Sequence, residues 1–146
     1  MAVLGAQDSE PLPLDLAGVR HVVGLPVTLA EVTLLLALAA HREDPLAPSS
    51  VMWTAVNRAR ARGTAVDIEL KRPGQYHGLW DGGSFPSPAR MGRLRLLALR
   101  VLRGEKPDPT RGSTHFHRVG SPAPAWSPEP SQWIRWGDHY FYKEVR

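Results

Sequence analysis

One apolar segment constrains the fold of this chain more than any other feature. In TLAEVTLLLALAAHRED, residues 28–44, Thr28 and Glu31 form the T-x-x-E pattern of a capping box, and apolar side chains fill most of the positions that follow. The pattern predicts a helix from about Leu29 to Asp44. A helix that is apolar nearly all round is buried, so this helix should be central to the domain.

A second helix is expected directly after it. It should begin after Pro48, with Ser49 or Ser50 as the N-cap, because an apolar stripe at helical spacing follows. Gly63 is a suitable residue for the left-handed position that ends a helix.

A third helix and two short strands complete the expected elements. The helix should start near Ser87, with proline at its first position, and run to about Arg103. Residues 114–119 and 138–145 are typical of strands. The long loop 71–87 is rich in glycine, proline and aromatic residues, and a loop of this length in a compact domain is usually functional.

Composition narrows the class of protein. The 146 residues fit one domain and contain no cysteine, which excludes a disulfide framework and cysteine-based zinc sites. Eighteen basic against 14 acidic residues give a net charge of +4, which favours polyanionic partners such as nucleic acid, anionic membranes or bacterial wall polymers. No apolar run is long enough to span a membrane, and no signal peptide is evident.

Glu43 is the candidate catalytic residue. It lies on the same helix face as Leu36, Ala39 and Ala40, so its carboxylate should be partly desolvated, with room above two small side chains. This is the environment of a general acid in a glycosidase. The alternative is a solvated helix end. Asp44 points about 100° away around the helix and would be a poor partner for Glu43.

His115 and His117 form an H-x-H pair whose side chains share one face of a strand. Together with His41, Glu43 or the Asp138–His139 pair they could hold a metal, but no ligand signature supports this. We therefore predict no metal and no cofactor.

Aromatic residues gather outside the expected helices, and most of the five tryptophans are among them. Aromatic faces stack on sugar rings or nucleobases. Packing within a small core is the alternative, at least for Trp133 and Trp136.

Several segments together resemble the cell-wall hydrolase family of spore-cortex-lytic enzymes (SleB-like). They follow the family's order between about residues 28 and 143: VMWTAVNRA, KRPGQYHGLWD, LLALRVLRGEKPDPTRGSTHFH, PAPAWSP and IRWGDHYFYK. The resemblance implies an α+β, mostly helical, lysozyme-like single domain with a small C-terminal antiparallel β-hairpin. It also implies cleavage of the β-1,4 bond between N-acetylmuramic acid and N-acetylglucosamine by one Glu on a buried helix.

The resemblance leaves two positions open for that Glu. The family's usual spacing from Asn57 leads back to Ala39, which cannot act as an acid and would imply an inactive protein. A connecting loop about four residues shorter places Glu43 there instead. One carboxylate suffices for a lytic transglycosylase, because the sugar's own C6 hydroxyl serves as nucleophile.

The resemblance also implies the substrate-binding residues. Gln75 and Tyr76 would line the glycan groove, Thr114 and His115 would face the cleft, and Trp126 would offer a stacking wall. His139 could equally be structural.

The sequence divides into an N-terminal arm, residues 1–27, and a cell-wall hydrolase-like domain, residues 28–146. The expected partner is the peptidoglycan glycan strand, and the expected place of action is the bacterial cell wall, reached by a particle, lysis or non-classical export. Two alternatives stay open. One is a degenerate structural or wall-binding component of a phage tail or tail-like injection assembly, whose other subunits would contact the arm. The other is a nucleic-acid-binding module.

Overall fold

The computed structural model describes residues 28–72, 75–80 and 83–144. The expected N-terminal arm, residues 1–27, lies outside the described residues. The elements in chain order are α2 (Leu29–Glu43), α3 (Pro48–Arg62), α4 (Val66–Lys71), α5 (His77–Trp80), α6 (Pro88–Leu102), β1 (His115–Arg118), the 3-10 turn η2 (Pro130–Gln132), β2 (Ile134–Trp136) and β3 (His139–Tyr142).

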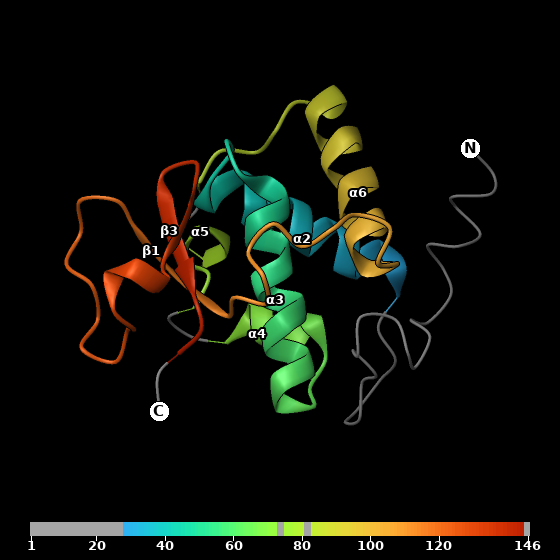
Figure 1. Cartoon of the computed structure of the whole chain (residues 1–146). Coiled ribbons are helices and arrows are strands. Elements are labelled where there is room, and N and C mark those ends of the chain that lie inside the picture. The colour runs from blue at the N-terminus through green and yellow to red at the C-terminus, as the bar shows by residue number, and fades with distance from the viewer. Residues whose placement is uncertain (1–27, 73–74, 81–82, 145–146) are drawn as a thin grey trace.

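Helix α2 is the centre of the domain, as predicted. Its N-cap is Thr28, whose hydroxyl accepts a hydrogen bond from the Glu31 backbone N–H at 3.3 Å. The helix contacts α3, α4, α5 and α6, and most of its apolar side chains are buried. In Figure 1, α6 lies on one side of α3 and the small sheet lies on the other. Within the described residues, no helix is long and apolar enough to cross a membrane.

Helix α3 has its N-cap two or three residues earlier than the sequence suggested. Its N-cap is Ala47, no side chain caps it, and Pro48 occupies the first turn. The expectation of Ser49 or Ser50 as the cap is therefore wrong. The fixed φ of proline is already suited to the first helical position, where its missing N–H costs nothing. Gly63 ends the helix with a φ of 66°, as predicted.

The sheet has one strand more than the predicted hairpin. Its order is β1-β3-β2, and both pairs are antiparallel. Phe116 of β1 pairs with Phe141 of β3, and Phe141 joins the helical core. The fold class is confirmed as mostly helical α+β, and the third strand enlarges the hairpin to a small sheet.

A buried carboxylate fastens the sheet to the end of α2. Asp44, which is 1% exposed, accepts hydrogen bonds from the backbone N–H of Asp138 and from the His139 ring, both at 2.8 Å. Gly137 has a φ of 55°, and a Cβ there would lie 2.5 Å from the Asp44 carboxylate. The turn between β2 and β3 can therefore approach this closely only because residue 137 is glycine.

Candidate active site

A cavity of about 460 Å³ lies beside the end of α2. Helices α2 and α3, the segment around α5, and strands β1 and β3 all contribute to its wall. Its lining residues include Glu43, Arg58, Gln75, His77, His115, His117, Trp126 and His139. The cavity thus gathers a carboxylate, amide and imidazole groups and an aromatic ring from segments far apart in the sequence.

Glu43 is the last residue of α2, and its side chain lines this cavity. Its Oε1 accepts a hydrogen bond from the backbone N–H of Gly78 at 3.0 Å. Its Oε2 has no hydrogen-bond partner among the described residues and is not a buried atom. One oxygen is therefore fixed by the protein, and the other is free to meet a ligand.

Gly78 allows α5 to pack directly against α2. A Cβ at this position would lie 2.5 Å from the Cβ of Arg42. Arg42 in turn donates to the Gly78 carbonyl at 3.1 Å. This close contact brings the Gly78 N–H to the carboxylate of Glu43.

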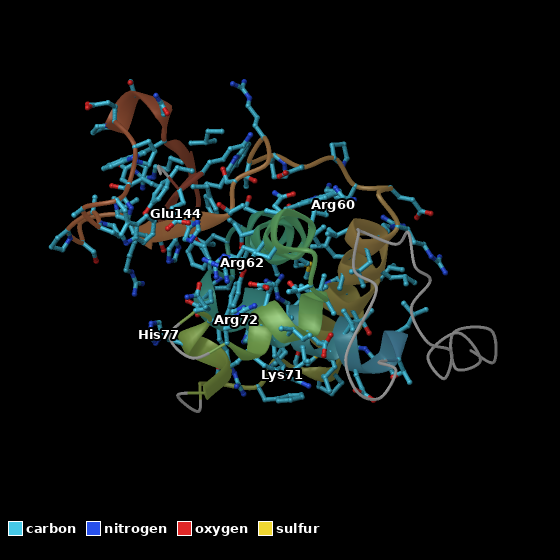
Figure 2. All side chains as sticks on the ribbon, turned by 90° about the horizontal axis from the view of Figure 1, so that it is seen from below. Arg60, Arg62, Lys71, Arg72, His77 and Glu144 are labelled. Carbon is cyan, nitrogen blue, oxygen red and sulfur yellow. The ribbon has the colours of Figure 1, made fainter. Side chains whose placement is uncertain are left out.

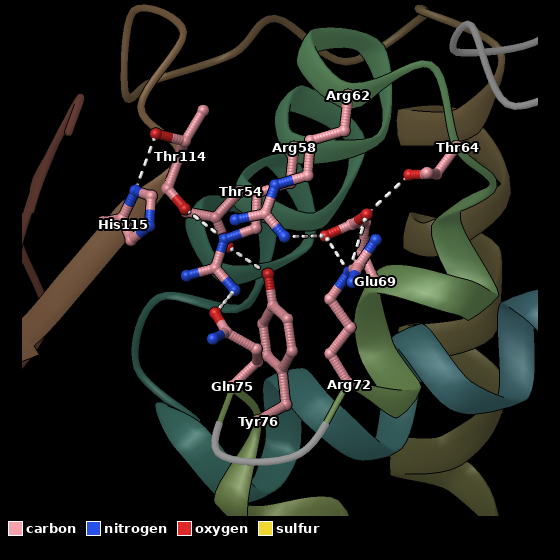
Figure 3. Close-up of polar contacts among 10 residues, drawn as sticks. All are labelled: Thr54, Arg58, Arg62, Thr64, Glu69, Arg72, Gln75, Tyr76, Thr114 and His115. Carbon is pink, nitrogen blue, oxygen red and sulfur yellow. Dashed lines mark hydrogen bonds and ion pairs between the residues drawn. The ribbon is translucent and has the colours of Figure 1, made fainter. Parts of the chain in front are cut away.

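Arg58 ties three segments together at the floor of the cavity. Its guanidinium donates to the Thr114 carbonyl and to the Gln75 side-chain oxygen, and it lies 5.2 Å from the centre of the Tyr76 ring (Figure 3). Arg58 is 4% exposed, although it is charged. The structure thereby assigns a wall position to a residue that sequence reasoning treated only as part of a helix motif.

Gln75 and Tyr76 have different placements. Gln75 lines the cavity. Tyr76 does not: its ring is fully buried, and its hydroxyl lies 2.9 Å from Thr54 Oγ1 (Figure 3). The expectation that Tyr76 lines the groove is therefore wrong, because the ring points into the core beneath Arg58. Burial raises the pKa of Tyr76, and the nearby Arg58 charge opposes this shift.

The neighbouring cations are neutralised by one buried carboxylate. Glu69, which is fully buried, accepts from Arg62 at 3.2 Å, from the Thr64 hydroxyl at 2.5 Å and from Arg72 at 3.1 Å (Figure 3). This cluster holds α4 against the end of α3 and fixes the side of the cavity from which Arg62 extends.

His115 and Trp126 form the aromatic side of the cavity. Their ring centres are 4.8 Å apart in an edge-on arrangement, and Trp126 is 41% exposed. Thr114 Oγ1 lies 2.8 Å from His115 Nδ1, so it orients the imidazole. Thr114 itself lines an adjoining cavity. The predicted residues Thr114, His115 and Trp126 therefore lie close together, and Thr114 supports His115.

His117 and Tyr142 lie on the same face of the sheet as His115. His117 Nδ1 and the Tyr142 hydroxyl are 2.9 Å apart. Burial lowers the pKa of His117, with a contribution from His139, and burial raises the pKa of Tyr142 to about 12. The two histidines of the H-x-H pair thus have different partners. Among the residues that the structure describes, no three His, Asp or Glu side chains gather as a metal site.

His139 lines the cavity and is held by Asp44. The role of His139 was left open by the sequence, and Asp44 was considered only as a poor partner for Glu43. Asp44 binds Nδ1 of His139, and the other ring nitrogen, Nε2, has no partner among the described residues and is not a buried atom. Neither pattern nor spacing reveals this pair, because 95 positions separate the two residues in the chain.

Two of the segments that resemble the hydrolase family meet in the structure: VMWTAVNRA contributes Asn57, and LLALRVLRGEKPDPTRGSTHFH contributes Asp108 and Ser113. Asn57 donates to Asp108 Oδ2 and to the Ser113 carbonyl, both at 2.9 Å. Asp108 also accepts from the backbone N–H groups of Thr110 and Gly112, at 2.8 Å each. These hydrogen bonds therefore build the turn that leads into β1 and so position His115, and Asn57 itself lines an adjoining cavity.

Comparison with known proteins supports the fold. No family model matches the sequence, and no curated protein matches it significantly. The crystal structure of the catalytic domain of the Bacillus cereus SleB protein is similar, with a TM-score of 0.63 and 19% sequence identity, over 86% of this chain and 95% of that one. The described chain has the fold of the SleB catalytic domain, and its cavity adjoins the end of the central helix.

Proposed function

We propose that this chain cleaves peptidoglycan glycan strands at the β-1,4 bond between N-acetylmuramic acid and N-acetylglucosamine. The observation that carries the proposal is the placement of Glu43: one carboxylate oxygen is held by the Gly78 N–H, and the other is accessible from a cavity walled by His115 and Trp126. The likeness to the SleB catalytic domain supports a cell-wall lytic activity.

In the proposed reaction Glu43 acts first as an acid and then as a base. Protonated Glu43 gives its proton to the glycosidic oxygen while the bond from that oxygen to the muramic acid C1 breaks. The C6 hydroxyl of the same sugar then attacks C1, and its proton returns to Glu43. A 1,6-anhydro ring closes, no water is consumed, and the carboxyl group is restored.

The other wall groups serve binding in this scheme. Trp126 offers an apolar face to a sugar ring, and the Gln75 amide and His115 offer hydrogen bonds to its substituents. Arg58 keeps the Gln75 and Thr114 segments in place. Such preorganisation fixes the scissile bond relative to Glu43.

The test is digestion of purified peptidoglycan, with the products identified by mass spectrometry. We expect fragments ending in 1,6-anhydro-muramic acid from the parent and none from Glu43→Gln. Fragments with a reducing end, heavier by one water, would keep the cleavage and refute the intramolecular step. Full activity of Glu43→Gln would refute the assignment of the acid.

A second function, binding without cleavage, is favoured by the composition of the cavity wall. Trp126, Gln75 and His115 can bind sugars whether or not Glu43 transfers a proton. A parent protein that binds peptidoglycan but releases no fragments would support this function. An assembly contact through residues 1–27 would belong to the same alternative.

A further inference from the structure

A second cavity continues from the one that contains Glu43. Its volume is about 570 Å³, and it shares Arg58, Arg62, His115 and Glu144 with the first. The residues that it adds include Asn57, Arg60 and Lys143. Figure 2 views α3 from its C-terminal end, with Arg60 and Arg62 around that end and Glu144 on the side of the sheet. The cavity is therefore richer in cations than in carboxylates.

Arg58 is the unusual member of this group. It is 4% exposed, yet its two hydrogen bonds go to neutral oxygens, and no carboxylate among the described residues pairs with it. Its Nη2 has no partner in the part of the chain that the structure describes and is not a buried atom, so it is accessible at the wall that the cavities share. Buried charges in proteins are normally paired, which leaves Arg58 without the usual compensation.

The other cations differ in how they are balanced. Arg62 shares its charge with the buried Glu69. Arg60 and Lys143 are exposed and form no ion pair within the described part of the chain, and Arg60 rests on the Trp53 ring at 5.6 Å. Among the described residues that line the second cavity, Glu144 is the one carboxylate. An anion that enters this cavity would therefore meet a positive wall with Arg58 at its inner end.

We propose that the second cavity binds a carboxylate carried by the glycan strand beside the scissile bond. This inference rests on the proposed function and deepens it, because it names the substituted, anionic strand as substrate. Two sources carry this chemistry: the stem peptide, and the lactyl group of muramic acid from which the peptide has been removed. Arg58, Arg60 and Lys143 would bind the anion, and the neutral sugars would occupy the cavity near Trp126.

The experiment measures binding, so that it is independent of cleavage. Calorimetry at low salt compares three probes on the full chain: a neutral chitooligosaccharide, a peptide-free muramic acid glycan, and the same glycan with its stem peptides. We expect at least one anionic probe to bind about tenfold more tightly than the neutral one. The probe with the larger gain identifies the source of the carboxylate.

The variant Arg60→Gln/Lys143→Gln should remove most of this gain and leave the affinity for the neutral probe unchanged. Both side chains are exposed, so the fold should be retained. Arg100→Gln, an exposed cation of α6 outside both cavities, is the matched control and should change neither affinity. Arg58→Lys keeps the charge and should keep part of the gain.

Equal affinity for neutral and anionic probes would overturn the inference, as would equal losses for both in the double variant. If the neutral probe still binds when the anionic probes show no advantage, the proposed function is retained and only the carboxylate subsite is refuted. Strong binding of a short DNA duplex in place of the glycans would also overturn it. Conversely, a preference for the anionic probes without any cleavage would support this subsite and count against the catalytic proposal.

Discussion

Replacing Asp44 by alanine should be one of the most damaging single changes to this fold. Its carboxylate is fully buried and accepts three hydrogen bonds, from the backbone N–H groups of Leu46 and Asp138 and from the His139 ring. The change would leave three donors without an acceptor in the space between α2 and the sheet.

The magnitude follows from those three groups. A buried donor left unsatisfied costs about 1–3 kcal/mol. The three costs are not fully additive, because relaxation and water will satisfy part of the site. We therefore expect Asp44→Ala to lower the free energy of unfolding by about 3–5 kcal/mol, out of a total on the order of 5–15 kcal/mol.

Urea unfolding followed by tryptophan fluorescence measures this change. Asp44→Asn keeps one acceptor oxygen and should lose only about 1–2 kcal/mol. Asp138→Ala, at the exposed neighbouring turn, is the matched control and should stay within about 0.5 kcal/mol of the parent. A loss below about 1 kcal/mol for Asp44→Ala would refute the reasoning, since it would show that the carboxylate does not hold the sheet.

Three further predictions concern other parts of the domain. Gly92→Ala, in open space on α6, should stabilise the fold by about 0.5–1 kcal/mol. Gly78→Ala should destabilise it, because the new Cβ would lie 2.5 Å from the Cβ of Arg42. Chemical denaturation measures both changes, and equal effects would contradict the packing described. The pKa of His117 is lowered in the folded state, so the unfolded chain takes up its proton first and stability should be constant above about pH 7 and fall as the pH drops below the usual histidine value of 6.5. Urea midpoints measured across this range should fall less in His117→Gln, and identical slopes would rule out that contribution. Trp126→Ala should weaken glycan binding about two- to tenfold with little change in stability, as measured by calorimetry, and unaltered affinity would remove Trp126 from the binding wall.

Local sequence signals predicted the helices well where several agreed. For α2, a side-chain cap and a nearly continuous apolar run indicated the same element, and for α6 the proline at the first helical position correctly placed the start. At α3 two signals competed: the serines suggested a cap, but Pro48 had already started the helix. Strand β2 was missed because it has three residues and is defined by its pairing with β3, which local pattern does not contain.

The candidate site was predictable only as a set of residue types. The resemblance selected Gln75, His115 and Trp126, and the structure places all three at one cavity with Glu43. The resemblance could not distinguish residues of the cavity wall from residues of the core beneath the wall, because burial depends on the tertiary packing. For that reason Tyr76 was assigned to the surface, although it is fully buried.

Arg58 and the Asp44–His139 pair were overlooked for the same physical reason. Arg58 forms part of the wall because two loops fold over it, and Asp44 finds His139 only when the sheet docks on the end of α2. Neither contact can be predicted from the charge or the spacing of residues along the chain.

The most direct test of the central claim is the product analysis of peptidoglycan incubated with the parent protein and with Glu43→Gln side by side. The account predicts 1,6-anhydro-muramic acid ends from the parent, no new ends from the variant, and unchanged urea unfolding of the variant. New glycan ends in equal amounts from both proteins would contradict it.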